Sequence, residues 1–233
     1  DRQMFAVVTA DSGCGKSTLT RRFYSELPKE DYIVLYLSDS KLTPRWFYKG
    51  LLDQLGLEPR FYRGDSERQL QQEIEIIRGV QHKKVVCILD EAHLLEKETL
   101  EEFRFLLNYK FDSVSPMAVV LVGQTELWEN KLKLQRYAAI RQRIDMYCTL
   151  PHLDRSETEQ YIGSHMAYSG CSQEVFTEKA VDEIHKASAG IPRMINRICE
   201  KALMYAFQQQ RRLVDDYMIK FVVEHEMLTV TTK

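Results

Sequence analysis

The stretch Thr9-Ala10-Asp11-Ser12-Gly13-Cys14-Gly15-Lys16-Ser17-Thr18 decides the fold class of this chain of 233 residues. It follows a strand-like apolar run at 4–9 and opens a run with helical spacing, which is the setting of a phosphate-binding loop. In such a loop, backbone N–H groups point at a phosphate, a lysine adds positive charge, and a hydroxyl ligates Mg²⁺. We therefore predict that Lys16 is catalytic, that Ser17 is a magnesium ligand, and that the nucleotide is bound by Ser12, Gly13, Cys14, Gly15, Lys16, Ser17 and Thr18.

One position of the loop departs from the usual pattern G-x-x-x-x-G-K-[ST]. Ala10 stands where the pattern has its first glycine, so the backbone there has to be compatible with a Cβ atom. The alternative interpretation is a glycine-rich turn between a strand and a helix that binds no ligand. The Lys16-Ser17 pair at the correct spacing favours the phosphate loop.

A second, acidic motif lies at the end of a buried strand. The run 85–89 is continuously apolar and is followed by two carboxylates, Asp90 and Glu91. Phosphoryl transfer needs positioning and charge neutralisation more than covalent chemistry. We predict that Asp90 holds Mg²⁺ and that Glu91 orients or deprotonates the attacking water, which would make the protein an Mg²⁺-dependent ATPase. The alternative is that both carboxylates cap the next helix, and His93 is interpreted as structural.

Five apolar runs with strand-like residues recur along the N-terminal part of the chain, at 4–9, 32–37, 85–89, 117–122 and 145–150. They are continuously apolar, as strands covered by helices on both faces must be, and stretches with helical spacing separate them. After Pro151 only helical segments follow. We predict an α/β fold with a five-stranded parallel sheet over residues 1–151, a small all-helical lid domain over 152–228, and a tail at 229–233.

The composition excludes several other classes of protein. Hydrophobic residues make up 44% and charged residues 28% of the chain, which is typical of a globular domain. The five cysteines show no C-x-x-C spacing, so neither a zinc site nor a disulfide framework is indicated. No apolar run is long enough for a membrane span, and no signal sequence opens the chain. We expect a cytoplasmic protein without a membrane partner and, because the chain starts at Asp1, further natural sequence before it.

Taken together, the motifs resemble those of the AAA+ superfamily of P-loop ATPases. Besides the phosphate loop and the acidic pair, Val122-Gly123-Gln124 ends the fourth predicted strand and Gly190-Ile191-Pro192-Arg193 opens a helix of the predicted lid. Three stretches are similar to the branch that contains ExeA-like secretion-pathway A-type ATPases and the transposon-encoded ATPases TniB, TnsC and MuB: Asp90-Glu91-Ala92-His93-Leu94, Leu121-Val122-Gly123-Gln124 and Arg141-Gln142-Arg143-Ile144. The resemblance covers nearly the whole chain.

The resemblance implies catalytic functions for three further residues. In the superfamily, a polar residue at the end of the fourth strand senses the γ-phosphate, and Gln124 occupies that place here. A lid arginine that contacts the γ-phosphate corresponds to Arg193. An arginine finger that reaches the nucleotide of the neighbouring subunit corresponds to Arg143, with Arg141 as the second choice. The alternatives are that Gln124 is an amide that caps backbone, that Arg193 faces solvent at an ordinary helix start, and that Arg143 belongs to a solvated basic face.

The same resemblance implies partners. An arginine finger requires a homo-oligomer, as a ring or a filament, and the transposon branch implies duplex DNA and a transposase. The protein would then be an ATP-dependent DNA-binding transposition helper or target-selection regulator. Because the net charge is −2, DNA contact would depend on a local group of cations interleaved with aromatic residues, namely Lys41, Arg45, Arg60, Arg63 and Arg68. The alternative is that these cations are ordinary surface residues.

Two other functions stay open. A secretion-pathway A-type ATPase of envelope assembly would carry a membrane span and a cell-wall-binding module outside this stretch. A nucleotide-dependent scaffold would bind ATP and scarcely turn it over, but Glu91 argues against that function.

Overall fold

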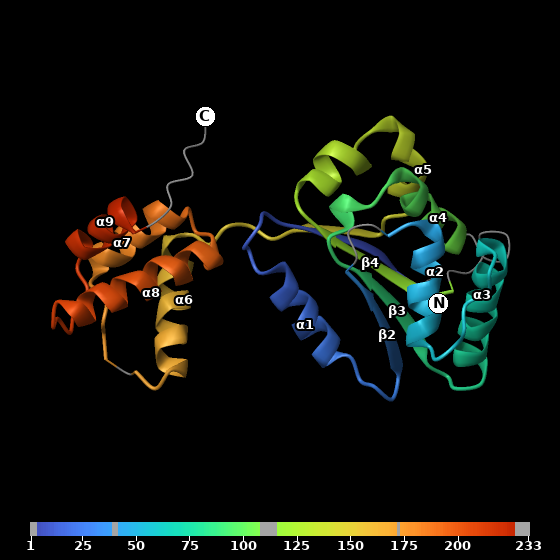
Figure 1. Ribbon diagram of the computed structural model, residues 1–233, viewed down its shortest axis with the longest axis horizontal. Coiled ribbons are helices and arrows are strands. Elements are labelled where there is room, and N and C mark those ends of the chain that lie inside the picture. The colour runs from blue at the N-terminus through green and yellow to red at the C-terminus, as the bar shows by residue number, and fades with distance from the viewer. Residues whose placement is uncertain (1–3, 39–41, 108–115, 172, 227–233) are drawn as a thin grey trace. The chain divides into compact units, whose positions relative to one another are not determined.

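The computed structural model describes residues 4–38, 42–107, 116–171 and 173–226 (Figure 1). The chain forms two compact units. The first comprises Asp1–Ser12 and Lys16–Leu150, and the second comprises Gly13–Gly15 and Pro151–Lys233. In the described part of the chain, no helix is both long enough and apolar enough to span a membrane.

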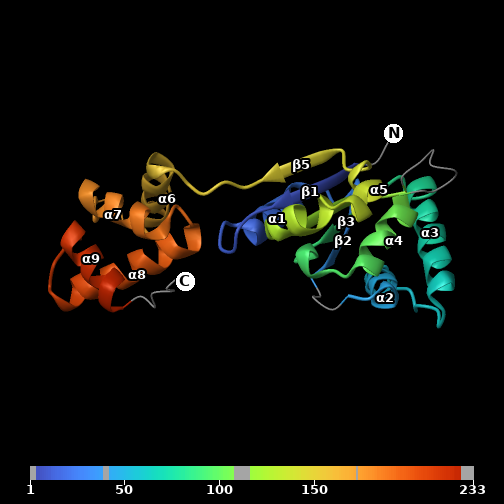
Figure 2. The ribbon, with the colours of Figure 1, turned by 90° about the horizontal axis from the view of Figure 1, so that it is seen from above.

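The first unit is built on a parallel sheet. Its five strands have the order β2-β3-β4-β1-β5, which confirms the predicted five-stranded parallel sheet. Figure 2 shows β5 beside β1 at one edge. Because all strands run the same way, their carboxyl ends meet along one edge of the sheet. The strands are β1 (Phe5–Thr9), β2 (Tyr32–Leu37), β3 (Lys84–Leu89), β4 (Ala118–Gly123) and β5 (Met146–Thr149).

Helices cover both faces of this sheet, which is why the strands read as continuous apolar runs. On one face, α2 (Pro44–Gln54), α3 (Arg63–Gly79) and α4 (Lys97–Leu107) pack with alternate strand residues into the main core. On the other face, α1 (Lys16–Glu26) lies beside a smaller cluster around Val86 and Ile88 (Figure 1). Shorter elements complete the unit: η1 (Ala92–Leu94), the π-helix η2 (Leu127–Leu132), η3 (Gln135–Tyr137) and α5 (Ala138–Arg141).

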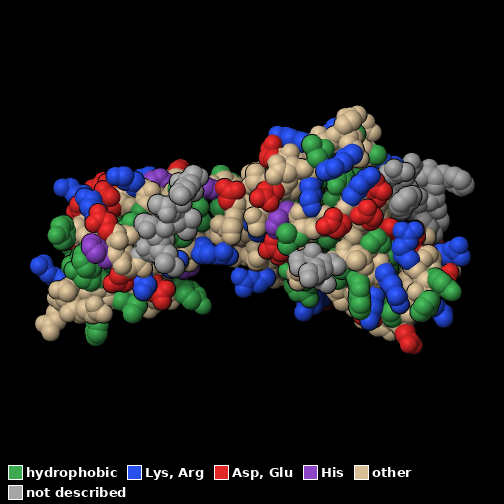
Figure 3. Space-filling view, turned by 45° about the horizontal axis from the view of Figure 1, so that its top comes forward, with side chains coloured by type: hydrophobic (Ala, Val, Ile, Leu, Met, Phe, Trp, Pro, Cys, Tyr) green, Lys and Arg blue, Asp and Glu red, His purple; other side chains and the backbone are tan. Residues whose placement is uncertain are grey.

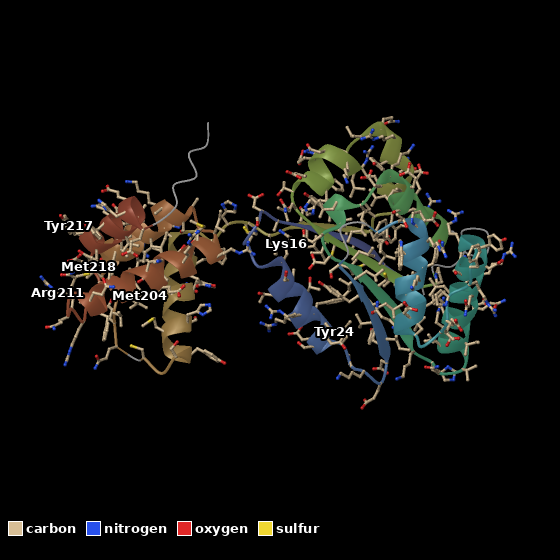
Figure 4. The ribbon with its side chains drawn as sticks, in the orientation of Figure 1. Lys16, Tyr24, Met204, Arg211, Tyr217 and Met218 are labelled. Carbon is tan, nitrogen blue, oxygen red and sulfur yellow. The ribbon has the colours of Figure 1, made fainter. Side chains whose placement is uncertain are left out.

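The second unit is helical, as predicted. It contains α6 (Arg155–Tyr168), α7 (Glu178–Ser188), α8 (Pro192–Gln208) and α9 (Asp216–His225). Local signals start these helices: Asp154 forms a capping box with Glu157, and α8 begins with a proline. Met218 lies in the core of this unit, whereas its neighbour Tyr217 is 75% exposed (Figure 4).

Candidate nucleotide site at the carboxyl edge of the sheet

The phosphate loop begins with Ala10, the residue that departs from the usual motif. Ala10 is fully buried, and its backbone N donates to Gly123 O at 3.2 Å, so the start of the loop is tied to the end of β4. A side chain larger than hydrogen is therefore accommodated here. The glycines that the loop requires come later, because Gly13 and Gly15 have φ values of +89° and +94°, which glycine adopts at low cost.

Lys16 opens α1 and turns its ammonium group back into the loop. The side-chain Nζ donates to Ala10 O at 2.8 Å and to Asp11 O at 3.0 Å, and the residue is only 8% exposed. Figure 4 shows Lys16 at the first turn of α1, with Tyr24 near the other end of the same helix. Ser17 and Thr18 follow on the exposed side of that first turn. The loop therefore holds a buried positive charge beside the N-terminus of α1, as phosphate binding requires.

Asp90 follows β3 and is held in place from two sides. Its Oδ1 accepts from Glu91 N at 2.9 Å, and its Oδ2 accepts from the Tyr36 hydroxyl at 3.0 Å. Partial burial and the bond to Asp90 raise the pKa of Tyr36, so the phenol keeps the proton that it donates. Asp90 is 6% exposed and so is a fixed carboxylate at the sheet edge.

The oxygen atoms at this edge fit Mg²⁺, which takes carboxylate, hydroxyl, water and phosphate ligands. A cavity of about 490 Å³ with a mainly apolar lining reaches Ser17 from α1 and Tyr36 from β2, and Tyr36 contacts Asp90. The Ser17 hydroxyl and the Asp90 carboxylate stay the predicted groups that would hold the ion.

Glu91 has an unusual backbone conformation. Its φ of 53° and ψ of 31° lie in the left-handed region, which residues other than glycine seldom adopt. Its side chain is 43% exposed, and no side chain caps η1. The structure therefore gives no support to the alternative in which Asp90 and Glu91 serve as helix caps. Instead, the partly solvated Glu91 carboxylate lies 3.4 Å from the ring of His93 in η1.

Gln124 directly follows β4, near the phosphate loop. Its backbone O accepts from Leu127 N at 2.8 Å, and the next residue, Thr125, donates through its hydroxyl to Asp11 Oδ1 at 2.8 Å. The side-chain amide of Gln124 makes no hydrogen bond within the described ranges, so the alternative of a backbone-capping amide is not observed.

His93 lies between Glu91 and Gln124, a position that the sequence did not reveal. Its Nδ1 is 3.4 Å from Glu91 Oε2 and 3.4 Å from Gln124 N. The residue is 7% exposed, and burial lowers its pKa, although Glu91 and Glu126 oppose this shift. A lone histidine two residues after Glu91 gives no local sequence signal for these two contacts, because its partner Gln124 is 31 residues away.

The two finger candidates differ in what they contact. Arg141 donates through Nη1 to Leu132 O at 2.8 Å and to Lys133 O at 2.7 Å, so it closes the end of η2. Arg143 donates through Nη1 to Ala139 O at 2.9 Å. Arg141 thus has a clear structural function inside the subunit, and Arg143 stays the predicted finger.

The predicted lid arginine, Arg193, is exposed in the first turn of α8. Its backbone N donates to Gly13 O at 3.2 Å, a contact inside the second unit. A Cβ at position 13 would lie 2.9 Å from Arg193 Cβ, so the close approach needs a glycine there. The contact of Arg193 with a γ-phosphate stays a prediction.

The predicted DNA-contacting cations fall into separate groups. Arg45 and Arg60 line one cavity of about 530 Å³, together with Lys49, Phe61 and two acidic residues, Asp53 and Glu58. The Arg45 guanidinium lies 5.2 Å from the centre of the Phe61 ring. We call Arg45, Lys49 and Arg60 the basic cavity. Lys41 lies outside the described residues.

Arg63 and Arg68 lie on α3, and each has an acidic partner. Arg63 Nη1 is 2.5 Å from Oε1 of the buried Glu102, whose other oxygen accepts from the Tyr48 hydroxyl at 2.6 Å. Arg68 forms a loose pair with Asp65 at 3.8 Å. Arg63 therefore neutralises a carboxylate in the core, whatever else it contacts.

The fold and the site together define an AAA+ P-loop protein. The sheet order β2-β3-β4-β1-β5, the loop after β1 and the acidic pair after β3 are the defining features. A profile of the family described as AAA domain matches residues 1–130, and the chain belongs to that family.

Comparison with known proteins agrees with this assignment. General secretion pathway protein A of Aeromonas hydrophila is 32% identical over 209 residues, which cover 87% of this chain and 37% of that protein. The ORC2 protein of Aeropyrum pernix, solved in ADPNP–ADP complexes, matches with a TM-score of 0.69 at 15% identity over 99% of this chain and 63% of its own. Drosophila ORC bound to DNA matches with a TM-score of 0.67 at 19% identity over 97% and 56%. The chain thus spans less than two thirds of each of these relatives.

Proposed function

We propose that this chain binds ATP together with Mg²⁺ and hydrolyses the γ-phosphate. The observation that carries the proposal is the arrangement of three charged groups at one sheet edge. Lys16 is buried inside the loop, Asp90 is fixed by Tyr36 and by Glu91 N, and Glu91 is partly solvated. Enzymes that transfer phosphoryl groups depend on this kind of fixed charge and positioning.

Each residue then has a chemical role. The N–H groups of residues 12–17 and the Lys16 ammonium bind the phosphate oxygens, and the ion on Ser17 and Asp90 would neutralise developing charge when bound. Glu91 orients the attacking water and accepts its proton on the carboxylate. The free amide of Gln124 hydrogen-bonds the water and the γ-phosphate. Arg193 and, from a neighbouring subunit, Arg143 would add positive charge, which requires a homo-oligomer.

The exchange of Glu91 for glutamine tests this proposal. Glu91→Gln keeps the size of the side chain but removes the proton acceptor, so we expect turnover to fall by about 100-fold or more while ATP binding changes less than about 2-fold. Glu96→Gln, at an exposed position close in sequence, is the matched control and leaves both unchanged. Wild-type turnover in Glu91→Gln would contradict the proposal, and so would a wild-type protein that binds ATP without hydrolysing it.

We further propose that the assembled ATPase binds duplex DNA and assists a transposase. Two observations support DNA binding: the basic cavity gathers three cations against two carboxylates beside an exposed aromatic ring, and Drosophila ORC, a fold relative, was solved bound to DNA. Figure 3 shows Lys and Arg interspersed with Asp and Glu over the face in view, so contact would be local. Several subunits in one assembly would multiply such contacts.

A second candidate function is that of a secretion-pathway A-type ATPase. The match to General secretion pathway protein A favours it, because that match covers 87% of this chain at 32% identity. In this function the ATPase would work on an envelope-assembly partner, through parts of a longer protein, and would not respond to DNA.

ATP hydrolysis measured with and without duplex DNA separates the two functions. The assay is run at low and moderate salt, with sedimentation or electron microscopy of the same samples, because binding to phosphates weakens with salt. Assembly and faster turnover that need both DNA and ATP would support the transposition function. An ATPase whose turnover and assembly are indifferent to DNA would remove that function and leave the secretion-type one.

A further inference from the structure

His93 is the one group in the described site that touches both the predicted catalytic carboxylate and the strand that carries the predicted phosphate sensor. The contact to each partner uses the same atom, Nδ1, at 3.4 Å from Glu91 Oε2 and at 3.4 Å from Gln124 N. One nitrogen cannot serve both partners at once. It either accepts a hydrogen bond or donates one, depending on whether it carries a proton.

The two proton positions have opposite consequences. With the proton on Nε2, Nδ1 accepts from Gln124 N–H, and its lone pair faces the Glu91 carboxylate without binding it. With the proton on Nδ1, the ring donates to Glu91 Oε2, and Gln124 N–H loses its acceptor. The total number of protons on the ring is the same in both states, so the exchange needs no change in charge.

The backbone around η1 places the His93 ring between Glu91 and Gln124. Leu94 N donates to Glu91 O at 2.9 Å and Leu95 N donates to Ala92 O at 3.2 Å, which closes the turn around η1. A Cβ on Gly123 would lie 3.0 Å from His93 N, so the turn approaches the end of β4 as closely as a glycine allows. His93 is therefore fixed between its two partners, and the position of the ring proton is what can change.

We propose that His93 is a positioning residue that couples the orientation of Glu91 to the backbone at Gln124 through the proton on Nδ1. This inference rests on the proposed ATP hydrolysis. A γ-phosphate that shifts Gln124 releases Nδ1 from the Gln124 N–H, and the ring then holds Glu91 toward the water. Without nucleotide, the Gln124 N–H keeps Nδ1, and Glu91 receives no hydrogen bond from the ring.

Two near-isosteric variants identify the working atom. An asparagine places a polar atom where Nδ1 lies, whereas a glutamine reaches the place of Nε2. We expect His93→Asn to keep turnover within about 3-fold of wild type, and His93→Gln and His93→Ala to lower it by about 10-fold or more, with ATP affinity unchanged in all three. Equal turnover in the Asn and Gln variants would overturn the assignment to Nδ1, and so would lost ATP binding in parallel with lost turnover.

A double variant separates this inference from the proposed function. If Glu91 is catalytic and His93 acts through it, His93→Ala adds no further loss in a Glu91→Gln background. Full turnover in Glu91→Gln alone would remove the proposed function. A normal effect of Glu91→Gln together with full turnover in His93→Gln would remove only this inference.

The wild-type protein offers a test that does not depend on variants folding. Ring ¹⁵N chemical shifts report which nitrogen of His93 carries the proton. We expect Nδ1 to be unprotonated in the free protein and to gain the proton when a non-hydrolysable ATP analogue binds with Mg²⁺. Ring shifts that stay the same on saturation with the analogue would overturn the coupling.

Discussion

The candidate nucleotide site at the carboxyl edge of the sheet and the basic cavity both contain cations, but the surroundings of these cations differ. Lys16 is 8% exposed and donates to two carbonyls of its own loop. Arg45, Lys49 and Arg60 have no ion pair within the described residues, and the contacts recorded for Arg45 and Lys49 are with aromatic rings. A cation that is fixed by backbone carbonyls is preorganised for one ligand atom. Cations that line a cavity without such bonds can only raise the local concentration of phosphate. The comparison therefore separates the proposed chemical site from the proposed docking surface.

The largest expected effect on turnover that tests this comparison concerns Arg143. If Arg143 acts on the nucleotide of a neighbouring subunit, Arg143→Ala should lower turnover by about 1000-fold, as the loss of an arginine finger does. Mixing Arg143→Ala subunits with Glu91→Gln subunits should then restore part of the turnover, because mixed interfaces contain one intact site. Arg141→Ala is the control: it loses carbonyl contacts within its own subunit, and mixing should not rescue it. Failure of the Arg143 mixture would show that this arginine does not act in trans.

The next effect concerns Arg63, which belongs with the fixed cations although it was predicted to contact DNA. Its removal leaves the buried Glu102 with the Tyr48 hydroxyl as its one side-chain partner among the described residues. Since half of the Arg63 side chain is exposed, we expect Arg63→Ala to lower the free energy of unfolding by about 2 kcal/mol in urea titrations. Arg68→Ala, which loses only a loose exposed pair, should change it by less than about 0.5 kcal/mol. Equal stability of the two variants would show that Arg63 is an ordinary surface cation.

A smaller effect is expected at the basic cavity. Replacing Arg45 and Arg60 together by alanine should lower DNA affinity several-fold and reduce the slope of log affinity against log salt by about 2, since each phosphate contact contributes about 0.9. Lys84→Ala is the control, because this exposed lysine at the start of β3 does not line the cavity. An unchanged salt slope in the double variant would remove the basic cavity as a DNA contact.

The smallest expected effect is the contribution of His93 to the pH dependence of the free energy of unfolding. Burial lowers the pKa of His93, so the folded protein binds this proton less readily than the unfolded chain does. The unfolded chain takes up the proton near pH 6.5, and the contribution of His93 to folding stability is therefore present above that pH and is lost as the pH falls below it. Urea titrations between pH 5 and pH 7.5 should show a steeper decline for wild type than for His93→Asn. Parallel curves would show that His93 does not titrate differently on folding.

The parts of the fold and site that could be predicted from the sequence are those encoded locally. The phosphate loop and the acidic pair are short motifs attached to strands, and parallel strands bring their carboxyl ends to one edge. The continuous apolar runs predicted the sheet because both of its faces are covered.

What escaped prediction depends on residues far apart in the chain. The partner of Arg63, Glu102, is 39 positions away, and the contact of His93 with Gln124 spans 31 positions. Neither contact leaves a periodic or compositional pattern in the sequence. A single histidine is most simply interpreted as a structural residue, which is why the sequence did not predict the contacts of His93. The structure also explains the departure at Ala10, because the φ of this residue is not positive and a glycine is therefore not required there.

The most direct test of the account is phosphate release from ATP by the purified protein with Mg²⁺, compared with the same protein in excess chelator and with Lys16→Ala. The account predicts steady turnover by wild type, none above background without the metal, and a loss of about 100-fold or more in Lys16→Ala together with weakened ATP binding. Turnover in Lys16→Ala equal to that of wild type, or turnover indifferent to Mg²⁺, would contradict an ATPase site at this edge of the sheet.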